Sequence, residues 1–200
     1  MMTMLMRIDK DIQNIQKAIA DALVRIDTIH LEYSQAIAHA TQQQILLSVF
    51  SFCTQKCPEA FLALSLSERQ DLQESLRKTI RTLSDRIQAQ LEECDRDSRV
   101  NQENLDNLLG RLLDESMGTL NQLLVDSKIL SAMQLQGEKA LQMSIRLAEI
   151  EFTDRQVMSH RGELRVLSAR IAHLQNELEK KYQQKMIAEA ELAWRSAWVE

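Results

Sequence analysis

The feature that most constrains this chain is a ladder of mostly apolar residues near its beginning, spaced alternately by four and three positions. This spacing keeps the ladder on one side of a helix and is typical of the a and d positions of a coiled coil. The ladder consists of Ile8, Ile12, Ile15, Ile19, Ala22, Ile26, Ile29, Tyr33, Ala36 and Ala40. The sequence therefore predicts a long N-terminal helix, within residues 1–52, that pairs with another helix.

The scarcity of turn-forming residues extends this prediction to the whole chain. Only 4 Gly and 1 Pro occur in 200 residues, and aromatic residues make up 4%. A sheet protein needs many tight turns, which draw on Gly and Pro, so this composition favours long helices. We expect an all-α protein whose helix content exceeds about 75%, far above the usual third.

A second ladder lies near the other end of the chain, at Leu164, Leu167, Ile171, Leu174 and Leu178. The two ladders pair either within one chain, as a long antiparallel coiled-coil hairpin, or between the chains of a homodimer. In the hairpin both helices rise about 1.5 Å per residue, so the numbers of paired residues should add to about 200. Ile26 is then expected opposite Leu174, and Met4 and Leu5 are expected to cover Trp194 and Trp198.

The middle of the chain, residues 58–118, is expected to form a small helical head. Pro58 suits the start of a short helix, and Ser67 with Gln70 has the pattern of a capping box that opens the next helix. Gly118 is expected to end the last helix of this segment. Residues 119–200 are then predicted to form a long C-terminal helix, with a break near Thr153, that pairs with the N-terminal helix.

Cys53 and Cys57 are the strongest candidates for chemistry, because residues four apart share a face of a helix. A structural zinc site needs four ligands, however, and neither Cys94 nor the 4 His residues have ligand spacing. The preferred interpretation is that both thiols are small buried side chains. The alternative is a thiol, metal or haem sensor built on them. No catalytic grouping or phosphate-binding loop is recognisable, so we expect no enzyme activity, no cofactor and no metal.

The charge balance and the apolar runs bear on partners and location. A formal net charge of −5 offers no basic surface for nucleic acid. The N-terminus lacks the apolar core of a signal peptide, and the apolar runs are too short to cross a bilayer, which favours a cytoplasmic protein without a transmembrane segment. Peripheral attachment to a membrane through Val49–Leu66 remains an alternative.

Trp194 and Trp198 are the best candidates for a partner contact, because Trp is enriched at the energetic centres of interfaces. Their alternative role is to seal the end of the hairpin. Taken together, the sequence predicts a non-catalytic coiled-coil adaptor, scaffold or assembly factor that acts through protein–protein contacts.

Overall fold

Helices account for nearly all residues that the structure, a computed structural model, describes, namely 2–94, 99–131 and 142–198. No strand occurs in these ranges, which confirms the all-α prediction made from the Gly and Pro content. The α-helices are α1 (Met2–Ser51), α2 (Pro58–Ala63), α3 (Leu66–Glu92), α5 (Gln102–Asp126), α6 (Leu147–Thr153) and α7 (Arg155–Ser196). A short π-helix, η1 (Phe52–Lys56), follows α1.

The chain divides into two compact units. The hairpin unit consists of Met1–Ile29 and Gly162–Glu200, and the head unit consists of His30–Arg161. Both α1 and α7 contribute residues to each unit, because each helix continues without interruption from one to the other.

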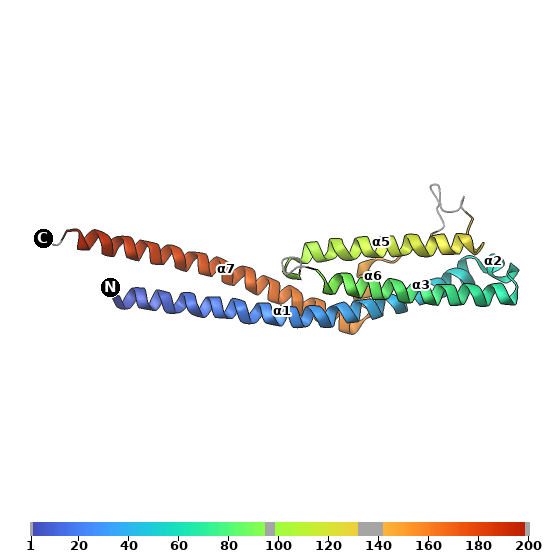
Figure 1. Cartoon of the computed structure of the whole chain (residues 1–200), viewed down its shortest axis with the longest axis horizontal. Coiled ribbons are helices and arrows are strands. Elements are labelled where there is room, and N and C mark those ends of the chain that lie inside the picture. Colours follow the sequence, from blue (N-terminus) through green and yellow to red (C-terminus); the bar gives the residue numbers. More distant parts are fainter. Residues whose placement is uncertain (1, 95–98, 132–141, 199–200) are drawn as a thin grey trace. The chain divides into compact units, whose positions relative to one another are not determined.

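In the hairpin unit, α1 and α7 run side by side in opposite directions (Figure 1). Ile8 and Ile12 of α1 form a buried cluster with Ala188 of α7, and Leu178 packs against it. This arrangement confirms the antiparallel hairpin that the two ladders predict. Its physical basis is the apolar ladder on each helix, which is removed from water only when the two faces meet.

Polar pairs flank this apolar contact. Lys181 Nζ lies 2.8 Å from Asp11 Oδ2, Lys185 Nζ lies 2.7 Å from Asp9 Oδ1, and Arg25 Nε lies 2.7 Å from Glu163 Oε1. The hydrogen bond from Lys181 lowers the pKa of Asp11 below its ordinary value of 3.8. The residue numbers of these three pairs total 192, 194 and 188, so the register is offset from the expected total of 200 by about one heptad or more.

The two ladders differ in burial along their length. Fully or nearly fully buried are Ile8, Ile12, Ile26, Ile29, Tyr33, Leu164 and Ile171. Half-buried are Ile15, Ile19, Leu167, Leu174 and Leu178. Two helices alone leave the edges of a shared seam open to water, which accounts for the second group.

In the head unit, the second half of α1 packs antiparallel against α3. Ser84 Oγ of α3 donates to the backbone oxygen of Ala38 at 2.9 Å, and His30 Nε2 of α1 lies 2.7 Å from the backbone oxygen of Leu91. Small residues on α1 permit this close approach. The apolar face of α3 completes the contact with Leu72, Leu76, Ile80, Leu83, Ile87 and Leu91.

The start of α3 lies two residues before the predicted one. Ser65, not Ser67, is the N-cap, and its hydroxyl accepts from the backbone N–H of Glu68 at 3.3 Å. Glu68 in turn accepts from the backbone N–H of Ser65 at 2.8 Å, which completes a capping box. Both serines are followed three residues later by Glu or Gln, so the local pattern fitted either start.

The helix end expected at Gly118 is wrong, because α5 continues through Gly118 to Asp126. Residues 142–146, which were expected to be helical, have no helical structure. Asn121 holds this segment: its side-chain amide donates to the backbone oxygen of Met143 at 2.9 Å and accepts from the backbone N–H of Met143 at 2.8 Å. Residues 132–141 of the predicted C-terminal helix lie outside the described residues.

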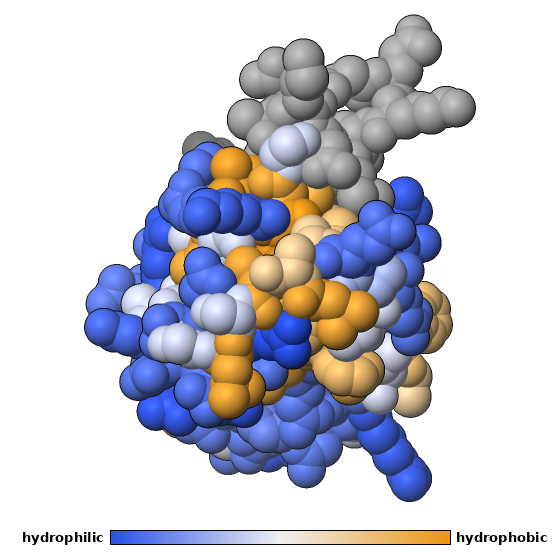
Figure 2. All heavy atoms as spheres, turned by 90° about the vertical axis from the view of Figure 1, so that its right-hand side faces the viewer, coloured by the Kyte–Doolittle hydropathy of each residue, from blue (hydrophilic) through white to orange (hydrophobic). Residues whose placement is uncertain are grey.

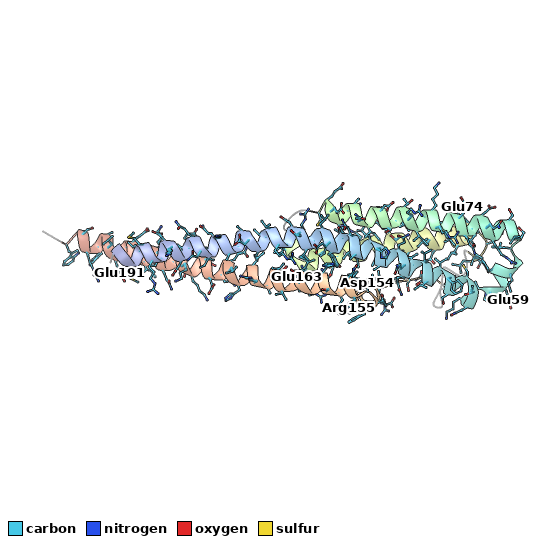
Figure 3. All side chains as sticks on the ribbon, turned by 90° about the horizontal axis from the view of Figure 1, so that it is seen from below. Glu59, Glu74, Asp154, Arg155, Glu163 and Glu191 are labelled. Atoms are coloured by element: carbon cyan, nitrogen blue, oxygen red, sulfur yellow. The ribbon has the colours of Figure 1, made fainter. Side chains whose placement is uncertain are left out.

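A break near Thr153 was expected, and α6 ends there. The residue that caps α7 is Asp154, whose carboxylate accepts from the backbone N–H groups of Gln156 and Val157 at 2.8 and 3.0 Å. Asp154 and Arg155 lie together at the beginning of α7 (Figure 3). The long C-terminal helix therefore begins at Arg155 rather than near residue 119.

Candidate functional site

The head unit contains an apolar groove of about 240 Å³ between α1, α2 and α3. We call it the α1–α3 groove. Its lining includes Leu46, Phe50, Phe61, Leu72, Leu76 and Arg77. Leu72 and Leu76 belong to the core and form the floor, whereas Phe50 is 65% exposed and forms a wall. The groove therefore joins buried apolar surface to exposed apolar surface.

Arg69 of α3 fixes the wall that α2 contributes. Its guanidinium donates to the backbone oxygens of Phe61 and Leu62, at 3.1 and 2.6 Å. The same group lies over the Phe61 ring, 5.6 Å from the ring centre. These contacts satisfy carbonyls at the end of the short helix α2 and hold the Phe61 side chain beside the groove.

The absence of charge along α1 distinguishes this region from the rest of the chain. Charged residues make up 26% of the sequence, yet none of Asp, Glu, Lys or Arg occurs between Tyr33 and Gln55. Leu46, Leu47 and Phe50 are exposed within this stretch. Burying such a surface against a partner removes no ionised group from water, so the usual desolvation cost is small.

Exposed apolar side chains continue beyond the groove, at Leu62 and Leu66. Figure 2 shows hydrophobic residues gathered on the face turned toward the viewer, with hydrophilic residues around them. Contiguous apolar surface with a polar border is typical of interaction sites.

Cys53 lies at the edge of this groove, and both Cys53 and Cys57 are free and buried. Cys53 lies within the π-helix η1 and Cys57 directly follows it, and the backbone N–H of Cys57 donates to the oxygen of Phe52, five residues earlier. Burial, together with the neighbouring Cys57, raises the pKa of Cys53 to about 11, and burial also raises the pKa of Cys57. A neutral buried thiol is a poor nucleophile and metal ligand, which favours a packing role.

Thiol alkylation tests this packing role. In the folded protein at pH 8, we expect iodoacetamide to modify half-buried Cys94 faster than Cys53, because Cys53 is both covered and protonated. Mass spectrometry after timed labelling measures the rates. Faster labelling of Cys53 than of Cys94 would contradict the assignment.

The raised pKa of Cys53 also affects stability at alkaline pH. Unfolded Cys53 ionises near its ordinary pKa of 9.0 and folded Cys53 near 11, so its contribution to stability falls as pH rises through this window. Cys53→Val should therefore reduce the alkaline loss of stability.

One Cys–His contact was not foreseen from the sequence. Cys94 Sγ lies 3.3 Å from His30 Nε2, although the two residues are far apart in the chain. The same nitrogen lies 2.7 Å from the backbone oxygen of Leu91, and a carbonyl oxygen only accepts hydrogen bonds, so Nε2 carries the proton. His30 therefore does not accept the thiol proton through this nitrogen, and the contact is not an activated thiol–imidazole pair.

A buried arginine is the second feature that sequence reasoning missed. Arg161, which is 1% exposed, contacts Asp106 of α5 and lies 3.2 Å, Nε to Oε1, from Glu151 of α6. Its guanidinium also lies 5.8 Å from the centre of the Tyr33 ring of α1. Four helices of the head unit thus meet at one cation. A signal was present, because Arg161 continues the apolar spacing from Val157 to Leu164.

Three basic residues of α7 are engaged in contacts within the chain. Arg161 is buried, and Lys181 and Lys185 pair with Asp11 and Asp9.

Trp194 lies on α7 and Trp198 in the turn that follows it, with their ring centres 5.5 Å apart. They are 66% and 73% exposed, and Met4 is exposed as well. The expected seal of the hairpin by Met4 and Leu5 over the two rings is therefore wrong. The register offset and the position of the rings on α7, away from the face that meets α1, explain this difference.

Within the described ranges, no three His, Cys, Asp or Glu side chains converge as a set of metal ligands. None of the helices described combines the length and apolar character needed to cross a membrane. Comparison of the chain with protein-family models, with curated proteins and with solved structures found no match.

Proposed function

We propose that this chain is a non-catalytic adaptor that binds an amphipathic helix of another protein in the α1–α3 groove. The observation that carries the proposal is the groove itself, whose apolar floor is formed by α3 and whose exposed wall is Phe50 of α1. A groove along paired helices suits a further helix, which inserts apolar residues spaced by three and four positions.

The charge of the groove specifies the partner further. Arg77 is the ionisable cation among the lining residues, and the neighbouring face of α1 carries no charge at all. A partner helix that places Asp or Glu beside Arg77 gains a favourable pair, whereas Lys or Arg there is repelled. The proposed occupant is therefore a helix with apolar anchors and an acidic edge.

Selection from a displayed library of helical peptides against the full chain tests this proposal. We expect enriched peptides to carry apolar residues at i, i+3 or i+4, and i+7, with an acidic residue beside them. Phe50→Ala should raise the Kd of such a peptide at least about tenfold, as expected for an aromatic anchor. Phe152→Ala is the matched control, because Phe152 is an exposed Phe of the same unit that lies on α6.

A charge swap gives the second part of the test. Arg77→Glu should weaken an acidic peptide and should restore binding when the acidic residue of the peptide is changed to Lys. Arg111→Glu, on the exposed side of α5, should do neither. Equal loss with Phe50→Ala and Phe152→Ala, or no recovery in the swap, would overturn the proposal. Phe50-dependent flotation with vesicles of phosphatidylcholine and phosphatidylserine, without peptide binding, would assign the groove to a membrane surface instead.

A further inference from the structure

The end of α7 carries a second apolar stripe that does not face α1. Residues Lys181, Lys185 and Ala188 mark the side of the helix that meets α1. At about 100° per residue, Trp194 falls roughly 150° and Trp198 roughly 110° around the axis from that side. We call Ile187, Ala190, Trp194, Ala197 and Trp198 the outer stripe. All five of its residues are exposed, and Ala197 and Trp198 lie in the turn that directly follows α7.

The outer stripe has the spacing of a coiled-coil seam. Ile187, Ala190, Trp194 and Ala197 follow one another by three, four and three positions. Bulky and small side chains alternate along it, and none of its members is charged. A surface of this kind fits a second helix, whose own bulky residues must meet the alanines.

The stripe is complementary to itself. If two copies of α7 pair antiparallel about a two-fold axis, one register places Trp194 opposite Ala190 of the other copy and Ile187 opposite its Ala197. Both bulky–small pairs occur in the same register, because the residue numbers in each pair have the same sum. We propose that two copies of this chain associate through the outer stripe in this antiparallel register.

The size of the stripe sets the strength of the dimer. The contact extends over about 15 Å of helix, from Ile187 to the end of α7 at Ser196, at 1.5 Å per residue, and over the turn that follows. It buries less than the roughly 800 Å² per partner of a standard stable interface. We therefore expect a dissociation constant on the order of 10–100 μM, near the weak end of specific association. Such a dimer presents two α1–α3 grooves, but it does not depend on the function proposed for them.

Sedimentation velocity of the full chain measures this association. Protein concentrations of roughly 1–500 μM bracket the expected dissociation constant. The weight-average mass should rise from that of a monomer toward that of a dimer. Trp194→Ala should reduce the association constant at least about tenfold, because it removes the central bulky residue. Val166→Ala is the control, since Val166 is an exposed apolar residue of the same helix outside the stripe.

Exchanging bulky and small residues tests the register itself. Ala190→Trp adds apolar surface, yet it should weaken the dimer because two indoles then collide. The double variant Ala190→Trp with Trp194→Ala should associate again, because bulky and small positions are merely exchanged. A chain that stays monomeric throughout this range would overturn the proposal. Association that strengthens with Ala190→Trp, or that the double variant fails to restore, would also overturn it.

Discussion

Ile26→Asp should lower the free energy of unfolding of the hairpin unit by about 4 kcal/mol, within the range for loss of a large core side chain and burial of an unpaired charge. Ile26 belongs to the N-terminal ladder and is 0% exposed. A carboxylate at this position has no water around it unless α1 and α7 separate. The expected result is therefore loss of the paired helices rather than a local adjustment.

Urea unfolding followed by circular dichroism measures this effect. Val24→Asp is the control, because Val24 lies two residues away on α1 and is 66% exposed, so a carboxylate there stays in water. Ile19→Asp should give an intermediate loss, since Ile19 is only half-buried. Equal midpoints for the Ile26 and Val24 variants would show that the ladder does not form the contact between α1 and α7.

Arg161→Met should destabilise the head unit by about 3 kcal/mol, the lower end of the range for removing one member of a buried ion pair. Methionine keeps the apolar stem of the side chain but leaves the carboxylates of Asp106 and Glu151 without the guanidinium. For a chain of this length, such a loss corresponds to a fall in Tm of roughly 6–12 °C.

Arg155→Met is the matched control for this experiment. Arg155 also belongs to α7, but it is exposed at the first turn of the helix. Adding Glu151→Leu to the Arg161 variant should recover part of the loss, because one buried carboxylate is then removed together with its partner. Thermal melts compare these three variants with the unsubstituted protein. An unchanged Tm in Arg161→Met would show that the cluster contributes nothing to stability.

The periodic parts of the chain were predictable, because they depend on short-range spacing. Ile8 to Tyr33 form one face wherever the helix lies, so a long helix and a helical partner follow directly from the sequence. Helix ends were less predictable, since they depend on competition between neighbouring signals. Ser65 and Ser67 both offered a cap. Gly118 lies within α5, where the packing of residues on both sides favours continuation of the helix.

The α1–α3 groove was not predictable, because it exists only after α1, α2 and α3 become neighbours. Arg69 determines the position of Phe61 through two backbone carbonyls, and nothing in the local sequence specifies that contact. Arg161 was missed for a related reason: a charged residue on a helix is normally solvated, and here three other helices replace the water.

The uninterrupted course of α1 has a consequence for hydrogen exchange. Up to Ile29, α1 belongs to the hairpin unit and pairs with α7, whereas from His30 onward it belongs to the head unit and packs against α3. Amide groups open locally according to the packing around them, so a single helix can contain segments of different stability. Protection against exchange should therefore rise along α1 near Tyr33, where Arg161 lies over the aromatic ring, although the helical hydrogen bonds on both sides are of the same kind.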